Sequence, residues 1–154
     1  MALNLKSLLF VSLFTALVAA PIAEATVRIR LLQLQGSVFC TPDGNILVNG
    51  TATPVFPNAV VQLRCGAGNV VVSAITNGAG VFSNIGLFPL NLSLSALLST
   101  CNLVVNTPLS NCNSTLPSVG RLQSPIQFNG TILLGPLNIL NITIVSPVRF
   151  RLVA

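Results

Sequence analysis

The chain has 154 residues, a formal net charge of +5 at neutral pH and only two acidic side chains. Charged residues make up 6% of it and hydrophobic residues 52%, whereas about a quarter of an ordinary soluble domain is charged. With no histidine and so few carboxylates, the chain lacks the groups that most acid–base and metal-dependent enzymes need. Its length predicts one domain that is large enough to bury a core.

The start of the chain is typical of a secretory signal peptide. A lysine gives it a positive start, an apolar run follows at 8–20, and A-E-A at 23–25 is a small-x-small cleavage site. A cut after Ala20 is the alternative. The run is shorter than the roughly 20 residues of a membrane span. We therefore predict a signal peptide at 1–25, a mature domain at 26–154 and secretion to the extracellular space.

The predicted mature domain offers little reactive chemistry. It holds six arginines, no lysine, no histidine, and Asp43 as its one carboxylate side chain. A serine nucleophile would have no base beside it, and a divalent metal would find one carboxylate. The glycine turns at 66–69 and 77–80 lack the lysine of a phosphate loop. Without Trp or Tyr, the usual aromatic platforms for bases are absent as well. We predict a non-enzymatic protein with no cofactor, no metal and no nucleic-acid partner.

Sequons of the type Asn-x-Ser/Thr mark candidate N-glycosylation sites, which in a secreted chain lie at the surface. The asparagines of these sequons are Asn49, Asn91, Asn113, Asn129 and Asn141. A chain rich in Asn and Thr also produces such triplets by chance, so we expect only part of them to carry sugars. Asn49 and Asn113 lie in turn-like sequence and are expected to be the most accessible.

The cysteines predict two disulfides, because an even number of cysteines in a secreted domain is typical of a disulfide framework. They are Cys40, Cys65, Cys101 and Cys112. Their positions alone leave all three pairings open. No pair has C-x-x-C spacing and the chain has no histidine, so a zinc or redox site is not expected. Each bridge would stabilise the fold by roughly 4 kcal/mol in the chain-entropy description.

Residues 27–40 begin as a strict alternation, which indicates a strand. One face is expected to carry Val27, Ile29 and Leu31, and the other Arg28 and Arg30. The apolar phase then slips by one position between Leu31 and Leu32. We interpret this slip as a β-bulge.

The middle of the chain consists of short strand patterns between turns. Pro and Gly predict a turn at 41–44, followed by a loop at 45–58 with a short edge strand. Residues 60–65 alternate as a strand with one wet face, and a glycine turn leads to a second strand at 70–76. The next turn, N-G-A-G, is a strong hairpin signal and leads to a third strand at 81–82.

In the last part of the chain the spacing of hydrophobic residues changes once from that of a strand to that of a helix. Leucines recur at helical spacing in 90–100, which predicts a short helix. A strand at 103–107, a loop at 108–119 and a strand–turn–strand unit at 124–153 are expected to follow. The final strand is expected to point Val148, Phe150 and Leu152 inward and Arg149 and Arg151 outward. Many short strands with Gly/Pro turns predict an all-β fold, a small antiparallel β-sandwich or barrel of about seven strands with one short helical insertion.

Three motifs resemble a known plant family. P-N-A-V-V-Q-L-R-C at 57–65, followed by T-N-G-A-G-V-F at 76–82, is similar to the signature of a prealbumin-like sandwich. Q-G-S-V-F-C at 35–40 resembles the entry motif of the plant pollen Ole e 1-like allergen family. The segment C-N-L-V-V-N-T-P-L-S-N-C-N-S-T-L-P at 101–117 is similar to the phylloplanin branch of that family.

The resemblance implies a small β-sandwich or barrel and two disulfides, Cys40–Cys112 and Cys65–Cys101. The family typically has six cysteines. The second would stand at Asp43, and the last is also missing here. The absent bridge would have tied the first turn to the C-terminal region. The family pattern implies no catalytic or binding residues.

The resemblance also implies a secreted, glycosylated plant surface defence protein that inhibits germination or growth of fungi and oomycetes. The expected partner is a microbial spore or membrane surface. If the terminal strands lie together, Arg28, Arg30, Arg149 and Arg151 would form a basic patch that faces an anionic surface. The alternative for these side chains is that they only hydrate edge strands.

Two other functions remain open from the sequence. One is an extracellular cell-wall or matrix protein that binds wall glycans or extensin-like partners in the apoplast. The other is a lipid carrier, suggested by the Leu-rich segment 87–98. The competing interpretation of that segment is a helix that caps the core.

Overall fold

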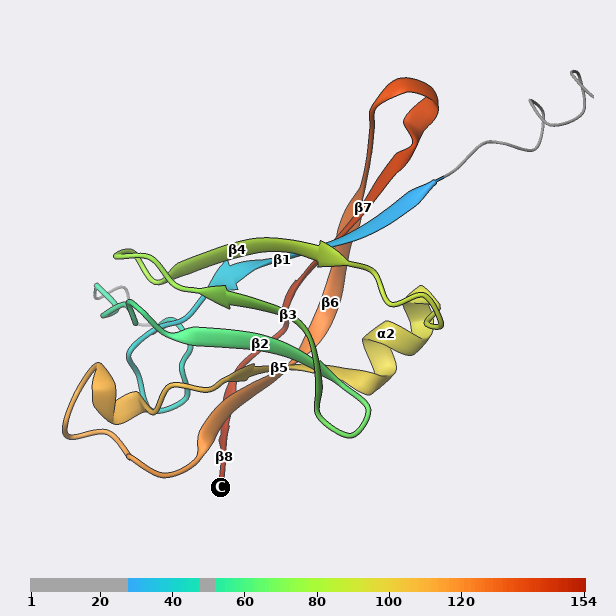
Figure 1. The fold of residues 1–154 in the computed structure, drawn as a ribbon. Coiled ribbons are helices and arrows are strands. Elements are labelled where there is room, and N and C mark those ends of the chain that lie inside the picture. Colours follow the sequence, from blue (N-terminus) through green and yellow to red (C-terminus); the bar gives the residue numbers. More distant parts are fainter. Residues whose placement is uncertain (1–27, 48–51) are drawn as a thin grey trace, which may run out of the picture.

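One sheet of eight strands runs through the residues that the structure describes, 28–47 and 52–154, in a computed structural model (Figure 1). The strands are β1 (Ile29–Ser37), β2 (Val60–Cys65), β3 (Asn69–Ile75), β4 (Val81–Leu87), β5 (Cys101–Val105), β6 (Arg121–Leu134), β7 (Leu140–Pro147) and β8 (Arg151–Val153). The helical elements are α2 (Leu94–Thr100), η1 (Leu109–Asn111) and η2 (Pro136–Asn138). The predicted signal peptide and Asn49 lie outside the described residues.

The strands follow the order β3-β2-β5-β6-β7-β1-β4. The short strand β8 lies outside this order and pairs with β6. β1 and β7 run parallel, and the other pairs are antiparallel. The end strands β3 and β4 also approach each other, where the Asn84 side chain donates a hydrogen bond to the Ser73 carbonyl. The sheet is therefore a nearly closed barrel. The predicted small all-β fold is confirmed.

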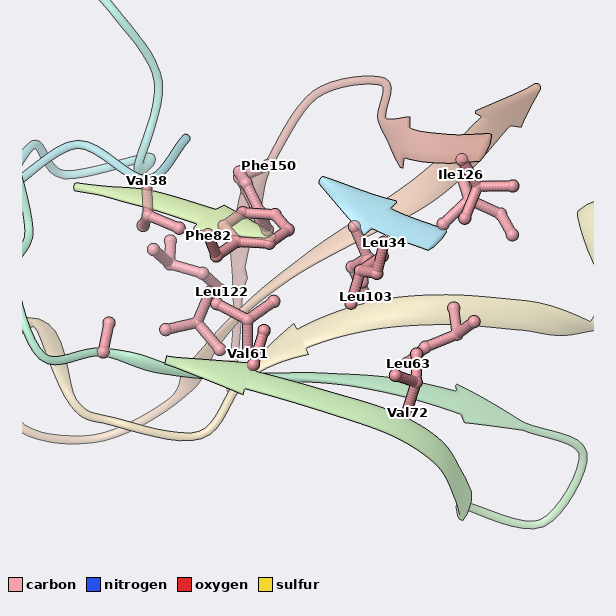
Figure 2. Packing of buried hydrophobic residues seen from close by; sticks show 14 of the residues in the cluster. Leu34, Val38, Val61, Leu63, Val72, Phe82, Leu103, Leu122, Ile126 and Phe150 are labelled. Atoms are coloured by element: carbon pink, nitrogen blue, oxygen red, sulfur yellow. The ribbon is translucent and has the colours of Figure 1, made fainter. Parts of the chain in front are cut away.

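The core lies inside this barrel, and each strand directs one of its faces toward it. Leu34 of β1, Leu63 of β2 and Leu103 of β5 are fully buried there (Figure 2). In β2 the buried side chains alternate with half-buried ones, as the predicted wet face requires. The long aromatic side chains Phe82 and Phe150 enter the same core from β4 and from the segment before β8.

The predicted helix is present but begins four residues later than expected. Ser93 caps it, because its Oγ accepts a hydrogen bond from the Ala96 backbone N–H at 3.2 Å. On its inner side, Leu97 is fully buried in the core and Leu94 and Leu98 pack against the same cluster. The helix therefore caps the core, which is the competing interpretation of the Leu-rich segment and not the lipid-carrier one.

The stretch from Phe56 to Phe82 acts as scaffold. The buried Thr76 hydroxyl donates a hydrogen bond to the Phe56 carbonyl at 2.6 Å and accepts one from the Ala59 N–H at 2.8 Å. Gly80 has φ +73°, and a Cβ there would lie 2.6 Å from the backbone oxygen of Val38. Only glycine fits this turn without strain. The signature residues of the stretch hold the loop before β2 against the turn before β4.

The β-bulge expected within 27–40 is wrong. β1 keeps an unbroken register with both of its neighbours, β4 and β7. The slip in the apolar pattern marks a change of surroundings instead. Leu32 and Leu34 face the core, whereas Ile29 and Leu31 lie on the outer face of the strand, and Ile29 is exposed. This happens because β1 extends beyond the barrel at its N-terminal end (Figure 1).

The final strand is shorter and more exposed than predicted. Phe150 is buried, as expected, but Val148 and Leu152 are 54% and 36% exposed. The prediction that Val148 points into the core is therefore wrong, whereas Leu152 lies opposite the buried Leu122 of β6, on the inner side as predicted, but stays partly exposed. β8 has three residues and pairs only with β6, so no further strand covers it. Its side chains remain at the rim of the sheet.

Candidate functional site

The structure does not bring the four terminal-strand arginines into one patch. Arg30 is level with Asn141 of β7 and, through it, with Leu133 of β6. Arg151 instead pairs with Gln123 near the start of β6. The intervening part of β6 corresponds to roughly 30 Å of strand at 3.3 Å per residue. The arginines form two separate pairs, Arg28 with Arg30 and Arg149 with Arg151, so the predicted single patch is wrong.

The first pair lies at the N-terminal end of β1. The guanidinium carbon of Arg30 is 4.0 Å from the centroid of the Phe88 ring, a cation–π contact. Both arginines line a small hollow of about 260 Å³ together with Leu87, Phe88 and Leu90. Among the described residues, neither forms a salt bridge. This end of the molecule therefore combines positive charge with apolar side chains.

The second pair includes the salt bridge of the described residues. Arg149 Nη2 lies 3.7 Å from Asp43 Oδ2, and both side chains are largely exposed. Partial burial by itself would raise the pKa of the Asp43 carboxyl, but hydrogen bonds from Asn45 and Thr41 outweigh it and lower the pKa below 3.8. The backbone N–H of Asn45 donates at 3.1 Å and the Thr41 hydroxyl at 3.2 Å. Asp43 stays charged beside Arg149.

A neighbouring asparagine ties the first turn to the C-terminal region. Asn45 Nδ2 donates to the Phe150 carbonyl at 2.7 Å, and Asn45 Oδ1 accepts from the Phe150 N–H at 2.9 Å. With the Asp43–Arg149 pair, these bonds join the two segments that the absent third bridge would have joined. The tie is therefore present in this chain, but it is made by hydrogen bonds and charge.

Two disulfides cross-link the fold. Cys40 is bonded to Cys112, and Cys65 to Cys101, the same pairs that the family resemblance implies. Cys65 and Cys101 are directly opposite each other on β2 and β5. Cys40–Cys112 ties the segment after β1 to the loop after η1. The Cys65–Cys101 bridge reinforces a pair of strands, and the Cys40–Cys112 bridge holds a long loop against the barrel.

Sequence reasoning missed a basic groove on the outer face of β2, β5 and β6. This groove has a volume of about 730 Å³, and its lining includes Arg64, Arg121, Asn102, Gln123, Asn106 and Ala154. Arg64 is held there by the Gln62 Oε1, which accepts from Nε at 3.1 Å and from Nη2 at 2.6 Å. No acidic side chain lines the groove. The sequence alternation predicts that Arg64 faces outward, but that Arg64 and Arg121 line the same groove depends on the strand order.

The candidate glycosylation sites differ in their surroundings. Asn91, Asn113 and Asn129 are exposed, whereas Asn141 is half-buried within β7. Asn113 Oδ1 accepts from the Thr115 N–H at 3.0 Å, and Asn129 Nδ2 donates to Ser146 Oγ at 2.7 Å. Sugar attachment at these positions stays a prediction.

The part of the chain that the structure describes contains no cluster of side chains that could bind a metal ion. Across 28–47 and 52–154, no group of three His, Cys, Asp or Glu side chains lies close enough together to hold a metal ion. Within the same residues, no helix has the length and apolar character to cross a membrane. The candidate functional features are therefore surfaces: the basic groove, and the end of the molecule that carries Arg28 and Arg30.

Comparison with known proteins identifies the family. Residues 28–154 match the phylloplanin family, described as phylloplanin antifungal protein. A phylloplanin of Nicotiana tabacum is 50% identical over 119 residues, which cover 75% of this chain and 74% of the relative. No solved structure gives a significant match. The chain belongs to the phylloplanin family.

Proposed function

We propose that this chain is a secreted, non-enzymatic protein of the plant surface that inhibits germination or growth of fungi and oomycetes. The observation that carries the proposal is the match to a family described as antifungal over nearly the whole folded domain. The surface chemistry supports it, because residues 26–154 contain six arginines and only one carboxylate side chain. Such a surface attracts anionic partners.

An extracellular setting is supported by the covalent structure. Two disulfides are typical of proteins that fold in an oxidising compartment and then work outside the cell. On a leaf surface or in the apoplast, cross-links also limit unfolding where no chaperone is present. The predicted signal peptide and the exposed sequons are in accord with this location.

The test is a spore-germination assay with the protein expressed through a plant secretory pathway. We expect germination of fungal or oomycete spores to fall as the native protein is added. The matched control is the same protein after reduction and alkylation, which has the same composition without the fold. Equal inhibition by both forms would point to a non-specific effect of a cationic chain, and no inhibition by the native form would contradict the proposal.

The basic groove favours one second candidate, binding to acidic glycans of the cell wall. Arg64 and Arg121 supply cations, and amide side chains such as Asn102 and Gln123 supply hydrogen bonds suited to sugar hydroxyls. The double variant R64Q/R121Q should then elute earlier from immobilised oligogalacturonate, whereas R28Q/R30Q should elute like the parent. The same elution for all three proteins would remove this candidate.

A further inference from the structure

The hairpin of β6 and β7 projects from the barrel together with the N-terminal end of β1 (Figure 1). Together with the adjoining edge of β4, it presents an outward sheet face made of aliphatic side chains. This outer apolar face consists of Ile29, Leu31, Ile85, Leu87, Ile132, Leu134, Leu140 and Ile142. Five of them are exposed, Leu87 to 71% and Leu134 to 47%, whereas Leu31 and Leu140 are half-buried and Ile142 is buried between its neighbours at 6%. No charged residue belongs to the face.

The face arises because three strands change their apolar side where they leave the barrel. In β6 a bulge between Phe128 and Gly130 shifts the register, so that Ile126 points into the core but Ile132 and Leu134 point outward. In β7 the aliphatic residues up to Ile144 share the outer side, and Val145 is buried inside. β1 makes the same change between Leu31 and Leu32, as described above.

The surroundings limit the face to one side of the projecting hairpin. Toward the barrel, the same outer side becomes polar at Gln33, Gln35 and Ser83. The opposite side of the hairpin carries Arg30, Thr131, Leu133, Asn141 and Thr143. A sugar at Asn141 would therefore lie on that opposite side. Glycosylation there would leave the outer apolar face open.

The end of the hairpin adds a protruding leucine and positive charge. Leu137 in η2 is 82% exposed at the tip, with φ +57°. Arg28 and Arg30 lie at the neighbouring end of β1, and the described residues give neither a carboxylate partner. Asp43, the only acidic side chain after residue 25, is bound to Arg149 elsewhere. Aliphatic side chains next to uncompensated arginines match the interface of an anionic lipid bilayer.

We propose that the outer apolar face and Leu137 insert into the surface of an anionic lipid bilayer, while Arg28 and Arg30, on the other side of the same strand end, lie at the depth of the headgroups. This inference deepens the proposed function, because it names the lipid layer of the microbial surface as partner. A second copy of the chain is the less suitable occupant. It would bring two further arginines to this end and no acidic side chain to pair with them.

A tryptophan reporter tests the insertion directly, because the chain contains no Trp or Tyr. L134W places the single indole on the outer apolar face, and V119W places it on an exposed loop at the far end of β6. With vesicles of phosphatidylcholine and phosphatidylglycerol, L134W fluorescence should shift to the blue and become protected from acrylamide. V119W fluorescence should do neither. Equal shifts in both, or none in L134W, would overturn the proposal.

Removal of side chains separates the apolar and electrostatic contributions. L87T/L137N removes two exposed leucines, and Asn tolerates the positive φ of position 137. Vesicle affinity should fall about tenfold or more. The matched control V119N/V148T removes two exposed valines elsewhere and should bind like the parent. R28Q/R30Q should lower the affinity for anionic vesicles toward that for pure phosphatidylcholine. Equal loss in the control variant would contradict the proposed face.

Two further measurements complete the test. Sedimentation of the lipid-free protein should give a monomer, and a dimer that L87T/L137N abolishes would assign the face to a second copy and overturn the proposal. The same variants are then assayed for spore germination. Loss of vesicle binding with full inhibition would reject the bilayer as the relevant partner and leave the proposed function intact. Vesicle binding without any inhibition by the parent would reject the function and leave the insertion intact.

Discussion

At the scale of single residues, Asn45 has the clearest structural role. Its amide donates to and accepts from the backbone of Phe150, 105 residues away in the chain. Asp43 beside it pairs with Arg149 and has a lowered pKa. These side chains join the two segments between which the family resemblance implies a further cysteine bridge. Their contribution to stability can be measured separately from that of the two disulfides.

The variant N45A should lower the free energy of unfolding by about 2 kcal/mol, because it removes the two side-chain hydrogen bonds to the Phe150 backbone and a third to the Asp43 carbonyl. Urea unfolding followed by far-UV circular dichroism measures this change. N111A, at an exposed asparagine of η1, is the control and should change the free energy very little. Equal effects of the two substitutions would mean that the tie to Phe150 contributes nothing.

Asp43 predicts the pH dependence of stability. A carboxyl with a lowered pKa in the folded state stabilises the fold above its unfolded pKa, near 3.8, and this contribution is lost as the pH falls through the folded pKa. Since the chain has no histidine, stability should stay nearly constant from about pH 5 to 8 and fall only below about pH 4. This decrease in stability should be small, because the Asp43 side chain is 48% exposed to solvent.

Thermal unfolding of D43N across the same pH range checks this prediction. The variant should be slightly less stable than the parent at neutral pH and should lose the decline below about pH 4. An undiminished decline in D43N would assign the acid sensitivity to another group.

At the scale of elements, β6 decides the shape of the molecule. Its first half pairs with β5 and β8 inside the barrel, and its second half forms the projecting hairpin with β7. The bulge at Asn129 separates the two halves and reverses which face is apolar. The barrel half depends on the disulfides and the core, whereas the projecting half has a free edge and few core contacts. The two halves should therefore differ in stability.

Removal of a disulfide tests how the barrel half is held. C40A/C112A should destabilise the fold by roughly 4 kcal/mol, because it opens a loop with a separation of 72 residues. C65A/C101A opens a separation of 36 residues, and loop entropy alone makes its effect about 0.6 kcal/mol smaller. Guanidinium unfolding of both variants measures the difference. A stability equal to the parent's in C40A/C112A would show that the loop after η1 is held by packing alone.

At the scale of the whole molecule, charge and apolar surface are unevenly distributed. The end that carries Arg149 also holds the described salt bridge and the tie to Asn45. The projecting end carries Arg28, Arg30 and the outer apolar face without an acidic side chain. A chain with so few carboxylates depends on hydroxyls and amides for hydration over the rest of its surface. This asymmetry supports the proposed attachment to a lipid surface by the projecting end.

Local patterns predicted some of these features and not others. Alternation within 60–65 predicted β2, because that strand keeps one face in the core throughout. The same rule failed at Leu31–Leu32, since a change of face and a bulge leave the same trace in a sequence. That Arg64 and Arg121 line one groove depends on strand order, which no local pattern contains.

The central claim, membership of an antifungal family with retained activity, is tested most directly by comparison with the tobacco relative. Germination of fungal spores is counted over a series of concentrations of this protein and of Nicotiana tabacum phylloplanin, prepared in the same host. With 50% identity between them, we predict inhibition by both proteins over overlapping concentrations. Inhibition by the tobacco protein and none by this chain, with its disulfides intact, would contradict the account.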